Sequence, residues 1–328
     1  MATTSSVGRE TSSGSGQPDA GARHRAEHRQ PCYLSIDLED FAHDYQRSLG
    51  VEHPRRDPGS LERACARLEE FSQTHLGGAR LTFFTTGQVA RDYPDIVRRL
   101  SADGHEIACH YYEHDQIWHE TRATFRRNLD MATTYLAGAS GQRIRGFRAP
   151  DFSIDERCAA WAYEELARIF DYDSSHTAQH HHGNPAAPLE MNLVTGRLRE
   201  IDIYRHSLLP GLDVRVIGGT YMRLLPITVI LRLLGRAFER GFVPQVYLHP
   251  YDLLDDRMQW SRYRELSHLK GHRRVYRWAR QVQWHSIGNR GIWTKLEQIY
   301  ARFVHPGPLA SLIDVTSPTE TDRDAANA

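Results

Sequence analysis

The stretch from residue 32 to residue 110 reads CYLSID (32–37), RLTFFTT (80–86) and HEIACH (105–110), with helical patterns at 59–75 and 88–103 between these runs. Short apolar runs bounded by polar residues are typical of buried strands, and the longer spacings between them predict helices. Strands that alternate with helices predict a largely parallel sheet. The stretch therefore predicts an α/β fold.

The same alternation continues to residue 250. It comprises a helix over 121–136, RIRGFRAP (143–150), a helix over 155–170, DYDSS (171–175), GRLREIDI (196–203), a helix over 226–240 and PQVYLHP (244–250). We expect one folded domain over residues 30–260, followed by a helical extension over 261–316. Residues 1–29 and 317–328 are polar and carry almost no large apolar side chains, so they predict disordered tails.

The composition excludes several functional classes. Lys plus Arg and Asp plus Glu both number 41, so no overall positive charge favours nucleic acid as a partner. The four cysteines form no CxxC pair, which argues against a disulfide framework and a structural zinc site. The N-terminus lacks the apolar run of a signal peptide, and the longest apolar run, over 226–234, contains Arg232. We expect a cytoplasmic protein without a transmembrane segment.

Two acids end the first predicted strand. In SIDLED, Asp37 and Glu39 are two residues apart, so a strand directs both carboxylates to the same side. Asp40 faces the other way unless the strand has already ended. Carboxylates that leave an apolar strand are costly to bury unless a cation or an arginine neutralises them. A solvated acidic cluster at the strand end is the alternative interpretation.

The second candidate element is the pair His110 and His114, which would share one face if the segment were helical. About one such pair is expected by chance among 19 histidines. The same spacing recurs at His24/His28, His176/His180 and His268/His272. Position distinguishes His110 and His114, because the predicted strand HEIACH delivers them to the edge that carries the two acids. One carboxylate with two imidazoles is a common zinc set that leaves a position open for water.

Other polar residues follow later strand-like runs: Arg148, Asp173 and His249. Ligands bind at the carboxyl ends of parallel strands, so these residues are candidates for the same site. Two of them also have a structural interpretation. Arg148 could form an ion pair with a surface carboxylate, and His249 could be a core histidine whose ring is hydrogen-bonded. The run His180–His182 lies among Gly, Asn and Pro, which favours a solvated or substrate-facing loop over a metal site.

The order of these segments resembles the polysaccharide deacetylases, which are carbohydrate esterase family 4 and are also called the chitooligosaccharide-deacetylase homology domain. The resemblance covers roughly residues 32–256. Its five motifs correspond to SIDLEDF, GHEIACHYYEH with His-x-x-x-His, RGFRAPDFSID, DYDSS and YLHPYD. The segment IGGTYMRLLP followed by YLHPYDL further resembles deacetylases of bacterial exopolysaccharide systems associated with exosortases.

The resemblance implies a distorted (β/α) barrel of about seven strands and one divalent metal ion, zinc or cobalt. By position in the motifs, Glu39, His110 and His114 would hold the metal. Glu39 stands where the family usually has an aspartate, so Asp40 is a rival ligand. The fourth motif lacks the tryptophan that usually follows it.

The resemblance also implies four catalytic side chains, which are Asp37, Arg148, Asp173 and His249. Asp37 would be the general base and Arg148 its charge partner. His249 would protonate the departing amine. A backbone N–H just after Pro150, that of Asp151, would bind the oxyanion.

The implied reaction is metal-dependent removal of the acetyl group from an N-acetylated amino sugar in a polysaccharide, an oligosaccharide or a glycoside precursor. One alternative is hydrolysis of a small cyclic amide or imide on the same scaffold. Another is a carbohydrate-binding protein without turnover. Trp118, Trp161 and Trp260 are candidates for stacking on sugars, although core packing explains each of them equally well.

Overall fold

The structure, a computed structural model, describes residues 29–180, 188–209, 212–215, 217–255 and 260–316. Apart from residue 29, the predicted tails over 1–29 and 317–328 lie outside the described residues. His181 and His182 of the histidine run also lie outside them.

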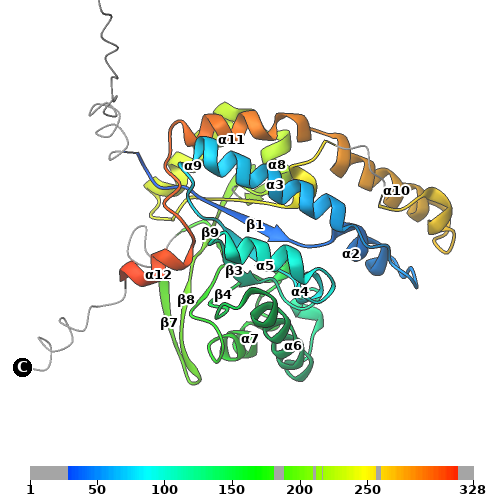
Figure 1. Cartoon of the computed structure of the whole chain (residues 1–328), viewed down its shortest axis with the longest axis horizontal. Coiled ribbons are helices and arrows are strands. Elements are labelled where there is room, and N and C mark those ends of the chain that lie inside the picture. Colours follow the sequence, from blue (N-terminus) through cyan, green and yellow to red (C-terminus); the bar gives the residue numbers. More distant parts are fainter. Residues whose placement is uncertain (1–28, 181–187, 210–211, 216, 256–259, 317–328) are drawn as a thin grey trace, which may run out of the picture.

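A curved sheet of eight strands forms the centre of the molecule (Figure 1). Its strands, in spatial order, are β11 (Gln245–Leu248), β1 (Tyr33–Leu38), β2 (Thr82–Thr85), β3 (Glu106–Cys109), β4 (Gly146–Phe147), β5 (Tyr172–Asp173), β8 (Gly196–Glu200) and β7 (Leu189–Leu193). Neighbouring strands are parallel from β11 to β8, and β7 runs antiparallel to β8. The predicted fold class, a distorted α/β barrel of about seven strands with a helical extension, is confirmed.

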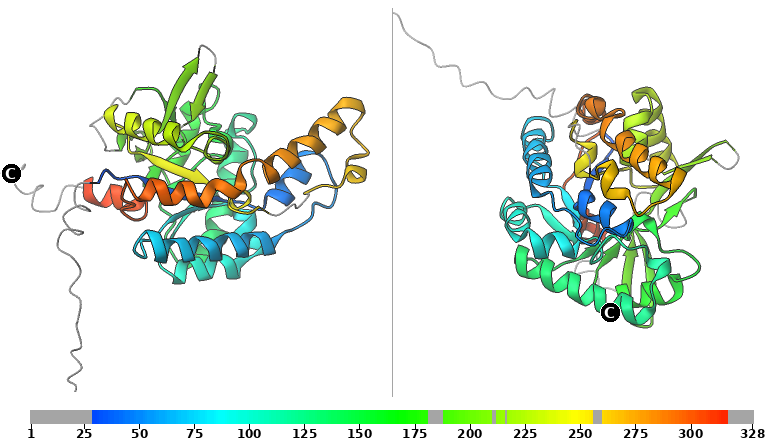
Figure 2. Two further views of the ribbon diagram at one scale, coloured as in Figure 1. Left: turned by 90° about the horizontal axis from the view of Figure 1, so that it is seen from above. Right: turned by 90° about the vertical axis from the view of Figure 1, so that its right-hand side faces the viewer.

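A smaller sheet has the order β10 (Leu212–Arg215), β9 (Ile203–Leu209) and β6 (Thr177–Ala178). Helices lie around the large sheet, and one of them, α10, projects beyond it (Figure 2). They are α2 (Phe41–Ser48), α3 (Pro58–His75), α4 (Gly87–Asp92), α5 (Pro94–Ala102), α6 (Arg122–Ser140), α7 (Ala159–Leu166), α8 (Gly219–Leu224), α9 (Ile227–Glu239), α10 (Gly271–Ser286), α11 (Ile292–Tyr300) and α12 (Ala310–Thr316). None of the described helices is both long and apolar enough to cross a bilayer.

The helix predicted over 88–103 is two helices, α4 and α5, so that prediction was wrong in one respect. The chain breaks at Tyr93, which has φ −133° and ψ 54°. Pro94 disfavours the helical conformation of the residue before it and has no N–H to continue the helix. Helix α4 therefore ends before Tyr93, and α5 begins at the proline.

Strand β1 is buried along its whole length, as a strand covered on both faces should be. Leu34, Ile36 and Leu38 belong to the main hydrophobic core. Burying each such side chain stabilises the fold by about 1.5–3 kcal/mol. The same strand contains Asp37, which is only 2% exposed, so one carboxylate is almost completely shielded from solvent.

The extension after residue 260 packs on α2. Tyr45 of α2 and Trp260 belong to a separate cluster of buried side chains, against which Phe41 and Trp284 of α10 pack. The Tyr45 hydroxyl donates to the carbonyl oxygen of Arg277 in α10. Since α2 begins directly after Glu39 and Asp40, this packing brings the extension to the carboxyl edge of the sheet.

Candidate metal centre

Four strands of the large sheet deliver polar side chains to one edge. Glu39 follows β1 directly, His110 comes directly after β3, Arg148 directly after β4 and His249 directly after β11. Asp37 lies within β1, two residues before Glu39. Parallel strands end at the same edge, so residues more than 200 positions apart in the chain meet there.

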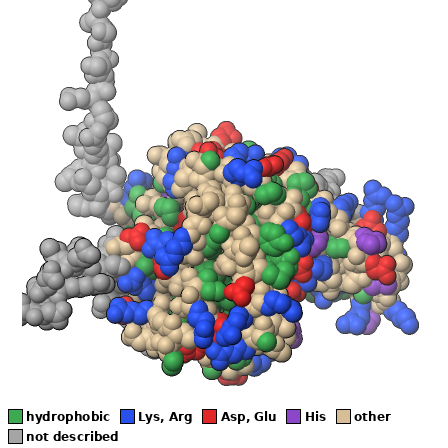
Figure 3. Space-filling view, turned by 60° about the horizontal axis from the view of Figure 1, so that its bottom comes forward, with side chains coloured by type: hydrophobic (Ala, Val, Ile, Leu, Met, Phe, Trp, Pro, Cys, Tyr) green, Lys and Arg blue, Asp and Glu red, His purple; other side chains and the backbone are tan. Residues whose placement is uncertain are grey.

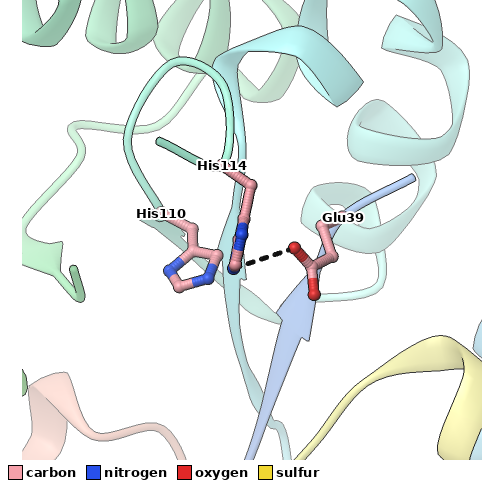
Figure 4. A group of neighbouring side chains, drawn as sticks. All are labelled: Glu39, His110 and His114. Atoms are coloured by element: carbon pink, nitrogen blue, oxygen red, sulfur yellow. Dashed lines mark ion pairs between the residues drawn. The ribbon is translucent and has the colours of Figure 1, made fainter. Parts of the chain in front are cut away.

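Glu39, His110 and His114 form a group that fits a metal ion (Figure 4). Each offers one ligand atom, and these atoms lie within 4.8 Å of one another. The Oε2 atom of Glu39 is 3.1 Å from Nε2 of His114. One carboxylate and two imidazoles are the donor set of many open zinc sites.

The Glu39 carboxylate needs a cation. It is 1% exposed, and neither of its oxygens has a hydrogen-bond partner in the part of the chain that the structure describes. Burial, together with the nearby carboxylates of Asp44 and Asp37, raises the pKa of Glu39 well above its usual value. A buried acid without hydrogen bonds is costly unless a positive charge compensates it. The residues present therefore fit a divalent ion.

The surroundings of His110 suit an imidazole that binds a cation. Its Nδ1 lies 2.8 Å from the carbonyl oxygen of Arg148, so Nδ1 carries the proton and Nε2 keeps its lone pair. Burial lowers the pKa of His110 to about 4, and the ring is neutral at pH 7. Such a backbone partner fixes the orientation of a metal-binding imidazole.

The segment that carries the two histidines is a loop, so a helical origin of their shared face is wrong. Tyr111 has φ 66°, in the left-handed region that residues other than glycine rarely occupy. The first two N–H groups of α4, those of Gly87 and Gln88, donate to the carbonyl oxygens of Tyr111 and Tyr112. The Tyr111 side chain is fully buried, and its hydroxyl accepts from Asn128 at 2.9 Å. These contacts hold a strained turn in which both imidazoles face Glu39.

Asp40, the rival ligand, is engaged elsewhere. Its Oδ1 caps α2 by accepting from the N–H of His43. Its Oδ2 accepts from the Tyr93 hydroxyl at 2.6 Å and from the N–H of Asp57 at 2.9 Å. The Glu39 carboxylate accepts no hydrogen bond from a described residue, and this contrast favours Glu39 as the acidic ligand.

Asp37 forms a buried ion pair with Arg148, at 2.8 Å. The guanidinium group also donates to Ser35, Ser174 and Gln245, and it lies over the ring of Phe84 at 4.0 Å. Burial raises the pKa of Asp37, but the nearby Arg148, His110 and His249 outweigh it and hold the pKa below its usual value. Asp37 is therefore ionised and rigidly oriented.

His249 contacts Asp252, which pairs with Arg223, and the sequence reasoning named neither residue. Its Nδ1 is 2.9 Å from Oδ2 of Asp252, and Oδ1 of Asp252 is 2.8 Å from Nε of Arg223. The Nε2 atom of His249 lies 3.9 Å from Asp37 and 3.7 Å from Glu39. Burial lowers the pKa of His249, but Asp252 outweighs this effect and the net shift is upward. The available signal was that Asp252 lies in the motif-like segment YLHPYD and Arg223 in IGGTYMRLLP.

Asp173, predicted as catalytic, does not line the cavity that opens over Glu39, His110 and His114. It is fully buried and accepts from the N–H of Ser175 at 3.1 Å and from its hydroxyl at 2.7 Å. The Ser175 hydroxyl in turn accepts from the N–H of Ala149 at 2.8 Å. Although both residues are described, no hydrogen bond or ion pair joins Asp173 to His249. The observed contacts of Asp173 support the backbone that leads to Pro150.

Pro150 and Asp151 form a short turn at the edge of the site. Asp151 has φ 54° and ψ 13°, again left-handed. Its N–H makes no hydrogen bond to any described residue, and its carboxylate accepts from Gln116 at 2.8 Å. The N–H of Asp151 is thus free to bind a ligand.

A cavity of about 670 Å³ opens over these groups. The site residues that line it are Asp37, Glu39, His110, His114, Asp151 and His249. Its other wall includes Tyr251 and, from α10, Arg277, Arg280 and Trp284. The volume is in the range of small-molecule sites and admits at least one sugar ring.

Two family patterns match the chain. Residues 75–167 match Polysaccharide deacetylase, and residues 174–290 match Domain of unknown function (DUF3473). The first match contains the histidine loop and Arg148. The second contains His249, Asp252, Arg223 and all of α10, and it runs across the predicted domain boundary at residue 260.

Curated relatives are similar over part of their length. A peptidoglycan-N-acetylglucosamine deacetylase of Bacillus cereus is 29% identical over 116 residues, which are 35% of this chain and 41% of the relative. A chitooligosaccharide deacetylase of Azorhizobium caulinodans is 31% identical over 99 residues, which are 30% of this chain and 42% of the relative. The chain thus spans about four tenths of the curated relatives it matches.

A solved structure shares the fold. A candidate polysaccharide deacetylase from Mycobacterium smegmatis superposes with a TM-score of 0.52 at 16% sequence identity. The match covers 88% of this chain and 94% of the other. At this identity the comparison bears on the fold alone.

Proposed function

The chain belongs to the polysaccharide deacetylase family, and from that premise we propose that it removes the acetyl group from an N-acetylated amino sugar in a metal-dependent hydrolysis. The substrate would be a polysaccharide, an oligosaccharide or a glycoside precursor. The observation that carries the proposal is the buried carboxylate of Glu39, which has no hydrogen bond to a described residue and lies beside the imidazoles of His110 and His114.

Glu39, His110 and His114 would hold one divalent ion, zinc or cobalt. Such an ion supplies the Lewis acidity that an unreactive amide carbonyl and neutral water both require. The neutral state of His110 supports this role, because only an unprotonated imidazole nitrogen can bind a cation.

Asp37 would accept the proton of the attacking water. The Arg148 ion pair keeps this carboxylate charged and fixes its direction, so it is ready as a base at neutral pH. Ser35 and Gln245 hold the guanidinium in turn, which makes the base part of the rigid core. Pre-organised groups of this kind need no rearrangement during the reaction.

The N–H of Asp151 would donate to the acyl oxygen as negative charge develops on it. His249 would give a proton to the departing amine nitrogen. Asp252 fixes the ring of His249 and favours its protonated form, and Arg223 holds Asp252. Asp252 and Arg223 would therefore act as positioning residues.

The direct test of this proposal is an acetate-release assay on N-acetylated oligosaccharides, sugar precursors and glycosides. We expect the purified protein to lose activity after chelation and to recover it when zinc or cobalt is added back. A chelated protein that keeps full activity would contradict the metal-dependent reaction. Release of an opened ring product from a cyclic amide, without acetate release from any sugar, would favour the alternative hydrolase.

Gly219→Ala is expected to reduce kcat by about ten-fold or more, because it disturbs His249 through Asp252. A Cβ atom at residue 219 would lie 1.7 Å from Oδ2 of Asp252, so the carboxylate must move away from the imidazole. Proton donation to a leaving group contributes about 10²–10⁴-fold to rate, and displacement of the orienting carboxylate loses part of that factor. Steady-state kinetics on the best substrate checks the result.

Gly235→Ala is the matched control. Gly235 lies inside α9, and a Cβ atom there would meet nothing within 4 Å. Alanine in a helix interior is favoured over glycine by roughly 0.5–1 kcal/mol, so this variant should unfold at an equal or higher temperature with unchanged kcat. Equal activity of the two variants would refute the role of Asp252.

A further inference from the structure

The segment from residue 266 to residue 296 contains no aspartate or glutamate, although the whole chain has equal numbers of acids and bases. Its cations are Lys270, Arg273, Arg274, Arg277, Arg280, Arg290 and Lys295. The segment includes all of α10, which projects from the body beside the carboxyl edge of the sheet (Figure 1). Lys, Arg and His side chains gather at this end of the molecule in the space-filling view (Figure 3).

One face of α10 is turned to the site. Arg277, Arg280 and Trp284 all line the cavity that contains Glu39 and the two imidazoles. They are spaced by three and four residues, which places them on the same side of a helix. The contact between the Tyr45 hydroxyl and the carbonyl of residue 277 fixes this face against α2. The helix is therefore a wall of the cavity.

The two cavity arginines have no carboxylate partner among the residues that the structure describes. The cavity acids Asp44 and Asp115 lie 3.7 and 2.8 Å from Arg47, and Asp37 pairs with Arg148. Arg280 instead lies over the ring of Trp284 at 4.6 Å and donates to the side chain of Gln283. Arg277 is exposed. Two guanidinium groups thus remain available to a ligand in the cavity.

We propose that Arg277 and Arg280 form a subsite for an anionic group of the substrate, a carboxylate or a phosphate on the acetylated saccharide. The inference rests on the proposed deacetylase function for the acetamide part of that substrate. Guanidinium groups bind carboxylate and phosphate oxygens through paired, charge-assisted hydrogen bonds. The absence of acids from the surrounding residues, 266–296, leaves no competing carboxylate on the same segment.

Trp284 extends the subsite. The Arg280 guanidinium lies over the Trp284 indole in the cavity wall. Tyr251 lines the same cavity and stacks on His249, with ring centroids 4.9 Å apart. Aromatic rings beside cations suit a sugar that has both an apolar face and a charged substituent. The helical extension would thereby select substrates for the centre at the strand ends.

The test compares two double variants of the full-length, metal-loaded protein. Arg277→Gln/Arg280→Gln removes the subsite, and Lys270→Gln/Arg273→Gln removes two charges from the same segment without touching the residues that line the cavity. The probes are N-acetylglucosamine 1-phosphate, an N-acetylated oligosaccharide that contains a glucuronate, and neutral tetra-N-acetylchitotetraose. Acetate release gives KM and kcat, and calorimetry gives Kd independently of turnover.

The native protein should prefer at least one anionic probe, and the preferred probe identifies the source of the charge. Loss of the subsite should raise KM and Kd for that probe by about ten-fold or more, with little change in kcat. The control double variant should keep the KM and Kd of the native protein for that probe. Both double variants should keep the native constants for the neutral probe. The subsite would be overturned if the native protein bound neutral and anionic probes with equal affinity. It would also be overturned if both double variants lost the same affinity for the anionic probe. Arginine-dependent binding without any acetate release would leave the subsite standing and refute the deacetylase function.

Discussion

Asp37→Asn is expected to lower acetate release by at least about 10²-fold while the protein still binds its metal. Asparagine has the size of aspartate but cannot accept the proton of the attacking water, and general base catalysis contributes about 10²–10⁴-fold. The atoms of Glu39, His110 and His114 that are proposed to bind the metal are untouched. The measurement is kcat together with metal content by elemental analysis.

The control for this variant concerns folding. Asp37→Asn would leave the fully buried Arg148 without its carboxylate partner, so some loss of stability is expected. The melting temperature and near-UV circular dichroism must therefore show a folded protein at the assay temperature. A folded, metal-loaded variant with activity close to that of the native protein would contradict the assignment of Asp37 as the base.

His110→Ala is expected to remove metal binding and turnover together, to the background of the assay. One of three protein ligands is lost, and the remaining Glu39 and His114 are too few for a stable zinc site. The same result is expected for His114→Ala. Metal content and acetate release are measured on the same preparations.

His119→Ala is the matched control for the histidine variants. His119 lines the same cavity but is exposed and does not belong to the group that fits a metal. It should keep both its metal and its activity. A metal-free His110→Ala protein that still releases acetate would refute the proposed chemistry, and loss of metal in His119→Ala would indicate a different ligand set.

The sequence was most informative where local pattern determines structure. Apolar runs placed the strands, and parallel strands end at a common edge, so Glu39, His110 and Arg148 could be brought together before any coordinates were known. The break at Pro94 was also readable, because proline restricts the residue before it. The helical spacing of apolar residues on either side of Pro94 nevertheless predicts a single helix over 88–103.

Other features depend on long-range packing and had no local signal. The left-handed conformation of Tyr111 arises from contacts of its loop with α4 and α6, so spacing alone suggested a helix instead. Arg223 meets Asp252 only after α8 packs against the end of β11. Trp284 and the cavity arginines come from a segment whose position on α2 cannot be read from periodicity.

The predicted catalytic role of Asp173 depends on motif order alone. The position of Asp173 at the end of β5 predicts a site residue, but β5 lies four positions from β1 in the sheet order and the Asp173 carboxylate is used by Ser175. Asp252, only three residues after His249, is the carboxylate that contacts Nδ1 of that imidazole. The catalytic role of Asp173 stays a prediction that Asp173→Asn can test.

The most direct test of the central claim is a crystal of the protein soaked with zinc and measured at the zinc absorption edge. We expect one strong anomalous peak between Oε of Glu39, Nε2 of His110 and Nε2 of His114, at about 2.0–2.2 Å from each. A fully soaked crystal with no peak among these three side chains, or with its peak at other residues, would contradict that claim.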